Sequence, residues 1–110
     1  MEARAIAKSL RVSPIRARLI ADLIRGKDVS EALTILSNVN NKSARLTKKV
    51  LDSAISNAVN NEGADQATLY VKEARVAAGP VMKRHMFDSR SHIGHNNHRT
   101  SHIIIVVATK

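Results

Sequence analysis

The chain has 110 residues, which is enough for one compact domain and too few for two well-packed ones. Its 18 lysines and arginines outnumber its 9 aspartates and glutamates, so the formal net charge at pH 7 is +9. This excess favours a polyanionic partner, and nucleic acid is the leading candidate. The absence of cysteine excludes disulfides and thiolate zinc sites, and no apolar run approaches the roughly 18 residues of a membrane span. We therefore expect a cytoplasmic protein with no membrane partner.

An opening strand is predicted for residues 3–12, where small or apolar side chains alternate with longer ones at a period of two. Ile6, Leu10 and Val12 fall on one side of this strand, which makes that side the apolar one. The strand belongs to the most basic segment of the chain, because residues 1–27 hold seven lysines and arginines against two acidic residues.

The first helix has the clearest boundaries. Ser13 can cap its start, Pro14 suits the first helical position, and Gly26 is a typical stop. Arginines lie elsewhere on the cylinder, so the helix is amphipathic. Its predicted apolar stripe consists of Ile15, Leu19, Leu23, Ile20 and Ile24.

Two more helices are predicted before the next strand. Asp28 with Glu31 three residues later resembles a capping box and begins a short helix that ends near the asparagine-rich residues 38–41. Asn41 can cap a longer helix that ends at Gly63. The apolar face of the longer helix consists of Ala44, Leu51, Ile55 and Ala58.

A basic triplet lies on one side of the third predicted helix. Lys42, Arg45 and Lys49 are spaced three and four residues apart, which places them on neighbouring turns of one face. From the spacing alone, a solvated helix face is the favoured interpretation.

The remaining elements are two strands and a long connection. Residues 67–78 suit a strand that Gly79 and Pro80 break or bend. Residues 100–108 include five consecutive β-branched residues, which predicts a strand at the centre of a sheet or one covered on both faces. The polar, basic and histidine-rich connection between them is longer than most loops in a small domain, and loops of this length are usually functional.

The order of elements predicts an α+β fold. We expect a single domain, residues 1–110, with three helices packed on a three-stranded antiparallel sheet. A long protruding β-hairpin, about residues 79–100, would lie between the last two strands.

Four of the five histidines lie in SHIGHNNHRTSHI, residues 91–103. His92, His95 and His98 repeat every three residues, but a strand would point such residues to opposite faces, and no cysteine completes a zinc site. A ribonuclease-like pair of histidines would lack a supporting shell of carboxylates or a phosphate loop. A metal-binding or RNA-processing protein that uses residues 85–102 is therefore the alternative hypothesis, and no cofactor is predicted.

A nucleic-acid-binding hairpin is the favoured interpretation of this segment. Basic side chains would meet phosphates, while histidines, serines and asparagines would hydrogen-bond phosphate, sugar or base edges. Phe87 is the one aromatic residue here that could stack on a base, so the shape and backbone of folded RNA are the expected target. The basic residues of the segment are Lys83, Arg84, Arg90 and Arg99.

Four stretches resemble the bacterial large-subunit ribosomal protein L-twenty-two family. They are SPIRARLIADLIRGKDVSEALTIL (13–36), KKVLDSAISNA (48–58), GPVMKR (79–84) and RTSHIIIVV (99–107), in the family's order. The resemblance covers essentially the whole chain and implies three helices on a three-stranded sheet with a long β-hairpin.

The resemblance also implies a function. The protein would be a structural, non-enzymatic constituent of the large ribosomal subunit that binds ribosomal RNA, supports assembly and lines the nascent-peptide exit tunnel with its hairpin tip. Its partners would be large-subunit ribosomal RNA, neighbouring ribosomal proteins and the nascent polypeptide, with no homo-oligomer.

Individual residue roles follow from the family's pattern and from the chemistry of the hairpin. The predicted tunnel-lining residues are Met82, Lys83, Arg84, Phe87 and Arg90. The predicted RNA-binding residues are Lys8, Arg11, Arg16, Arg18, Lys83, Arg84, Arg90, His92, His98, Arg99, Thr100, Ser101 and His102.

The hairpin tip departs from the family's pattern. The family usually has an Arg-Pro-Arg-like or Met-Pro-Arg-like run here, whereas this chain has MFDSRSHIGHNNH at residues 86–98. Phe87 stands where proline is expected and Asp88 where a basic residue is expected, and histidines and asparagines replace several arginines. The length of the connection is preserved, so we expect the hairpin to reach the tunnel with altered tip chemistry.

Overall fold

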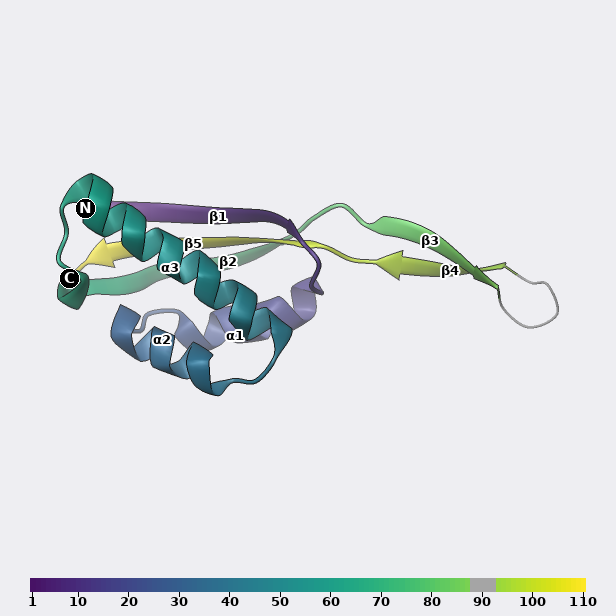
Figure 1. The fold of residues 1–110 in the computed structure, drawn as a ribbon, viewed down its shortest axis with the longest axis horizontal. Helices are drawn as coiled ribbons and strands as arrows, with labels where there is room; N and C mark the ends of the chain where they lie inside the picture. The colour runs from purple at the N-terminus through teal and green to yellow at the C-terminus, as the bar shows by residue number, and fades with distance from the viewer. Residues whose placement is uncertain (88–92) are drawn as a thin grey trace.

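The computed structural model covers residues 1–110 and describes the backbone of residues 1–87 and 93–110 and the side chains of residues 1–81 and 99–110. The elements in chain order are β1 (Glu2–Leu10), α1 (Pro14–Ile24), α2 (Val29–Asn38), α3 (Lys42–Glu62), a 3-10 helix (Gln66–Thr68), β2 (Leu69–Ala78), β3 (Met82–Phe87), β4 (Ile93–His98) and β5 (Ser101–Thr109) (Figure 1). Within the described residues, no helix combines the length and apolarity that crossing a membrane requires.

The main sheet is antiparallel, with the strand order β1-β5-β2 and the helices packed on one face (Figure 1). β5 lies at the centre, as its run of β-branched residues predicted. β3 and β4 form a separate antiparallel ladder from Met82 opposite His98 to Phe87 opposite Ile93. This ladder projects beyond the main sheet, which confirms the predicted α+β fold with a protruding hairpin.

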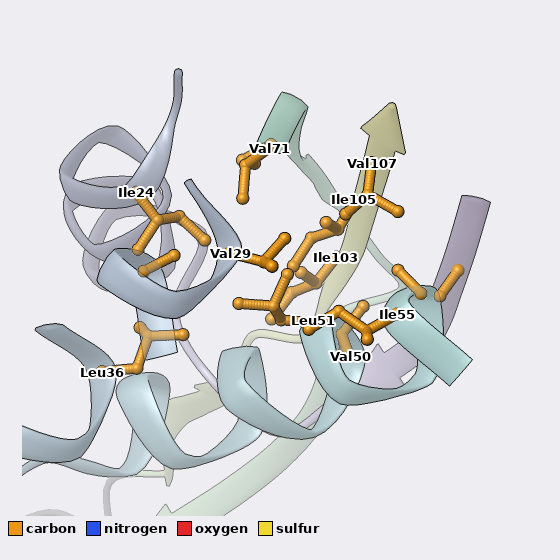
Figure 2. Packing of buried hydrophobic residues seen from close by; sticks show 14 of the residues in the cluster. Ile24, Val29, Leu36, Val50, Leu51, Ile55, Val71, Ile103, Ile105 and Val107 are labelled. Carbon is orange, nitrogen blue, oxygen red and sulfur yellow. The ribbon is translucent and has the colours of Figure 1, made fainter. Parts of the chain in front are cut away.

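The core lies between the main sheet and the helices, and it is aliphatic. Leu51 and Ile55 of α3 face Ile103 and Ile105 of the central strand (Figure 2). All four residues of the predicted apolar face of α3 are buried, which confirms that prediction. Burial of each large aliphatic side chain contributes about 1.5–3 kcal/mol, so this layer supplies much of the stability of the fold.

The predicted apolar side of the first strand is wrong for Ile6. Ala3 and Ala5 face the core, whereas Ile6 is exposed on the other face. The ladder between β1 and β5 shifts register between Ala7 and Leu10, which returns Leu10 to the edge of the core. Alanine faces the core here, where α3 packs against β1.

The predicted stripe of α1 is also partly wrong. Ile20 and Ile24 are buried, but Ile15, Leu19 and Leu23 are 71%, 64% and 46% exposed. The buried face of the helix is completed by Pro14, Ala17 and Ala21. Small residues let α1 approach its neighbours closely, so the larger aliphatic residues point outward.

The helix boundaries agree with the predictions more closely than the caps do. The Asn41 side chain accepts a hydrogen bond of 2.7 Å from the Ala44 N–H, and Gly63 ends α3 at φ 68°. Ser13 and Asp28 occupy the predicted cap positions, but neither side chain makes a cap hydrogen bond. Asp28 instead pairs with the Lys110 ammonium at 2.5 Å, so the predicted capping box does not form.

Candidate nucleic-acid interface

The root of the hairpin is a close crossing of two chain segments. The Gly79 N–H donates to the Thr100 carbonyl at 2.9 Å, and the Thr100 hydroxyl donates to the Pro80 carbonyl. A Cβ on residue 79 would lie 2.6 Å from Thr100 Oγ1, which is closer than real Cβ contacts come. Glycine therefore allows the two arms of the hairpin to approach each other as they leave the main sheet.

The returning strand is tied to the turn that follows β1. Ser101 is fully buried, and its hydroxyl donates to the Val12 carbonyl at 2.7 Å. His102 Nδ1 accepts a 2.9 Å hydrogen bond from the Ser9 main-chain N–H. In the neutral imidazole, this acceptor role at Nδ1 places the ring proton on Nε2. The side chains of Ser101 and His102 thus attach the hairpin root to the end of β1 and the turn after it.

The same turn is also attached to α3. Lys42 Nζ donates a hydrogen bond of 2.8 Å to the Arg11 carbonyl. Spacing along the sequence gives no signal for this contact, because the two residues are 31 positions apart. Lys42 was predicted to be part of a solvated helix face, and the structure brings it beside a predicted RNA-binding residue.

The predicted RNA-binding basic residues of the globular part lie on two regions of the surface. Leu10 of β1 is the ladder partner of Ser101 of β5. Arg11 follows Leu10 and Arg99 lies two residues before Ser101, so both arginines are at the hairpin root. Arg16 and Arg18 are exposed on α1, where a separation of two residues places them on different sides of the helix. The exposed members of the predicted set are Lys8, Arg11, Arg16, Arg18 and Arg99.

The hairpin places the remaining predicted residues along two strands. Lys83 pairs with Asn97 and Arg84 with Asn96 along the ladder. Met82 and Phe87 are at the two ends of β3, and His98 ends β4 opposite Met82. The predictions for Arg90 and His92 lie outside the described residues.

The histidine segment was the basis of the metal-binding alternative. His85 and His95 are ladder partners, and His98 lies three positions further along β4, opposite Met82. Across the part of the chain that the structure describes, no three residues of the types His, Cys, Asp and Glu are grouped as metal ligands. The side chains of His85, His92, His95 and His98 lie outside the described residues, so the metal-binding alternative stays a hypothesis.

Matches to known proteins extend over nearly the whole chain. The model of the family described as ribosomal protein L22p/L17e matches residues 5–108. The large ribosomal subunit protein uL22 of Halothermothrix orenii is 50% identical over 110 residues, which cover 100% of this chain and 97% of the relative.

Two further relatives carry the same name. The uL22 protein of Syntrophomonas wolfei subsp. wolfei is 49% identical over 107 residues, covering 97% of this chain and 95% of the relative. That of Carboxydothermus hydrogenoformans is 49% identical over 110 residues, covering 100% and 97%. The matches therefore include both the globular part and the hairpin.

Proposed function

Because the chain belongs to the ribosomal protein L22p/L17e family, we propose that it binds large-subunit ribosomal RNA through its basic surface and extends its hairpin into the nascent-peptide exit tunnel. It is a structural constituent of the large ribosomal subunit in the cytoplasm, and it is not an enzyme.

The observation that carries the proposal is the ribbon formed by β3 and β4. The molecule measures 61 × 25 × 16 Å, and the ribbon extends its long axis beyond the main sheet (Figure 1). A two-stranded hairpin is marginally stable in water because it lacks a core of its own. A ribbon of this kind gains stability when RNA surrounds it, as assembly into a large subunit would provide.

The basic surface supplies attraction to phosphate. The exposed groups of Lys8, Arg11 and Arg99 surround the hairpin root, and Arg16 and Arg18 extend the charge along α1. Thr100, Ser101 and His102 then set the direction of the hairpin through the contacts at its root. Further phosphate contacts would come from Lys83, Arg84, Arg90, His92 and His98, and the tunnel wall from Met82 and Phe87 together with Lys83, Arg84 and Arg90.

Salt dependence of RNA binding tests the electrostatic part. Arg11→Gln and Arg16→Gln should each weaken binding to large-subunit ribosomal RNA and shallow the plot of log K against log salt by about 0.9. Arg75→Gln is the matched control, because this exposed arginine lies on β2 and pairs with Glu73. Equal losses in all three variants, or binding that ignores salt, would contradict the proposal.

Cross-linking tests the tunnel part. A photoreactive amino acid at position 87 should cross-link to a nascent peptide stalled on assembled ribosomes, because β3 leads toward the hairpin tip. The same group at position 59 on α3 is the control and should give no such product. Failure of the protein to sediment with the large subunit would overturn the whole assignment.

A further inference from the structure

A groove runs between the edge strand β1 and α3. It has a volume of about 260 Å³. Ile6, Lys49 and Ser53 are exposed, so the groove is open to solvent. The residues that line it are Ala5, Ile6, Ala7 and Leu10 from β1 and Leu46, Lys49, Val50 and Ser53 from α3.

The charge beside this groove is positive. Lys49 is the single charged residue among those that line it. Arg45 lies one turn before Lys49 on α3, and Asp52 is the first acidic residue of that helix. Lys42, one turn before Leu46, binds the Arg11 carbonyl, so the groove is continuous with the hairpin root and its predicted RNA-binding residues.

The edge of β1 adds main-chain hydrogen-bonding groups. Asn57 Nδ2 on α3 donates to the Arg4 carbonyl at 3.0 Å, so the Arg4 carbonyl points away from β5 and toward α3. Main-chain groups of alternate residues point to the same side of a strand, and the ladder is regular from Arg4 to Ile6. The N–H and C=O of Ile6 therefore point to the side where the groove lies.

We propose that this groove receives an unpaired nucleotide of the large-subunit ribosomal RNA. The base would lie against the aliphatic side chains of Leu10 and Leu46 and beside the main-chain groups of Ile6, and a neighbouring phosphate would lie on Lys49. This proposal rests on the RNA binding proposed above. It adds the site of one contact and specifies that the nucleotide bound there is unpaired. Lys49 of the basic triplet on α3 thereby acquires a function that its spacing did not indicate.

Charge complementarity favours a nucleotide over a peptide side chain. An apolar peptide side chain would fill the groove but leave Lys49 without an anionic partner, whereas a nucleotide supplies a base and a phosphate together. A base-paired nucleotide is excluded because its faces are stacked on neighbouring bases and its Watson–Crick edge is paired, so it cannot enter a groove on the protein. The expected ligand is therefore a base that is turned out of its stack.

Chemical probing of the RNA tests the proposal. Complexes of ribosomal RNA with the wild-type protein should protect one or two unpaired nucleotides from base-specific and backbone-specific reagents. Ser53→Leu fills the groove from its exposed side, and Lys49→Gln removes its charge. Each variant should restore reactivity at those nucleotides and weaken RNA binding, by about tenfold for Ser53→Leu.

Ser56→Leu is the matched control for groove filling, because Ser56 is an exposed serine on α3 outside the groove lining. It should leave the protection and the affinity unchanged. The groove assignment is overturned if Ser53→Leu and Lys49→Gln keep full protection while Arg11→Gln still weakens binding, a result that leaves the proposed function intact. A wild-type protein that binds no ribosomal RNA would overturn both, and a photo-cross-link from position 53 to a protein would identify a peptide occupant instead.

Discussion

The main-chain N–H of Ser9 donates a hydrogen bond to His102 Nδ1 and so joins two residues 93 positions apart. Ser9 lies at φ 55°, the single non-glycine residue with positive φ in the described part of the chain, where the register of β1 and β5 shifts. A bulge of this kind leaves a main-chain donor without its ladder partner. The imidazole of His102 supplies the acceptor, so the bulge and the returning arm of the hairpin stabilise each other.

Replacing His102 should lower stability. His102→Leu leaves the Ser9 N–H without its acceptor, and the free energy of unfolding should fall by about 1 kcal/mol in a urea titration. Ser9→Gly is the control, because it keeps the N–H donor and glycine adopts a positive φ readily. Its stability should equal or exceed that of the wild type. An unchanged midpoint for His102→Leu would show that the hydrogen bond contributes nothing.

A methyl group at position 79 should disturb the hairpin root. In Gly79→Ala, the new Cβ would meet Thr100 Oγ1 at 2.6 Å and His102 Cε1 at 3.2 Å, so one segment must shift. We expect the free energy of unfolding to fall by about 1–3 kcal/mol, measured by thermal or urea unfolding. The double variant with Thr100→Ala should recover part of the loss, because it removes the nearest atom. Strictly additive effects would argue against the close contact.

The buried hydroxyl of Thr47 should be a site where stability can be gained. Thr47 is 1% exposed, and within the described part of the chain its Oγ1 has no hydrogen-bond partner. Thr47→Val keeps the shape but removes the unsatisfied hydroxyl, so the free energy of unfolding should rise by about 1 kcal/mol. Thr34→Val on the exposed side of α2, where the hydroxyl donates to the Ser30 carbonyl, should give no such gain.

An ion pair on the open face of the sheet predicts a pH dependence. The Lys72 ammonium hydrogen-bonds to the Glu2 carboxylate, from β2 to β1 across the central strand. This hydrogen bond, followed by the lysine charge, lowers the pKa of Glu2 from its usual 4.5, and the carboxylate raises the pKa of Lys72 from its usual 10.5. Folding therefore favours the charged form of both groups.

The stabilisation is present above the unfolded pKa of Glu2 and is lost as pH falls through its lowered folded pKa. For Lys72, it is present below pH 10.5 and is lost as pH rises through the raised folded pKa. The melting temperature of the wild type should thus exceed that of Glu2→Gln most between about pH 5 and pH 10, at low salt because both groups are exposed. Glu62→Gln on α3 is the control. A difference that does not change with pH would contradict the assignment.

Those features of the fold that depend on residues adjacent in the sequence were predictable from the sequence. The Asn41 cap, the Gly63 stop and the central position of β5 each depend on residues that lie next to one another in the sequence. The faces of α1 and β1 depend instead on how closely helices and strands approach each other. Alanines allow that close approach, so the spacing of large apolar residues predicted buried faces for Ile15 and Ile6 when both are exposed.

The sequence indicated which residues belong to the candidate site, but it did not indicate which of them contact one another. The basic residues and the glycine at the root can be read from the sequence, and the family's pattern gives their order. The contacts from Ser9 to His102, from Val12 to Ser101 and from Arg11 to Lys42 join segments 93, 89 and 31 residues apart. A bulge in β1 creates the first of these, and nothing in the local pattern of residues 3–12 indicates a bulge.

The direct continuation of β4 into β5 has a mechanical consequence. Tension on the hairpin along its length would pass through Arg99 and Thr100 into the central strand, which lies antiparallel to a neighbour on each side. The hydrogen bonds of both ladders run perpendicular to the strands, so this load would shear many of them together rather than break them one by one. The globular part is thus built as an anchor that resists pulling on the arm it holds.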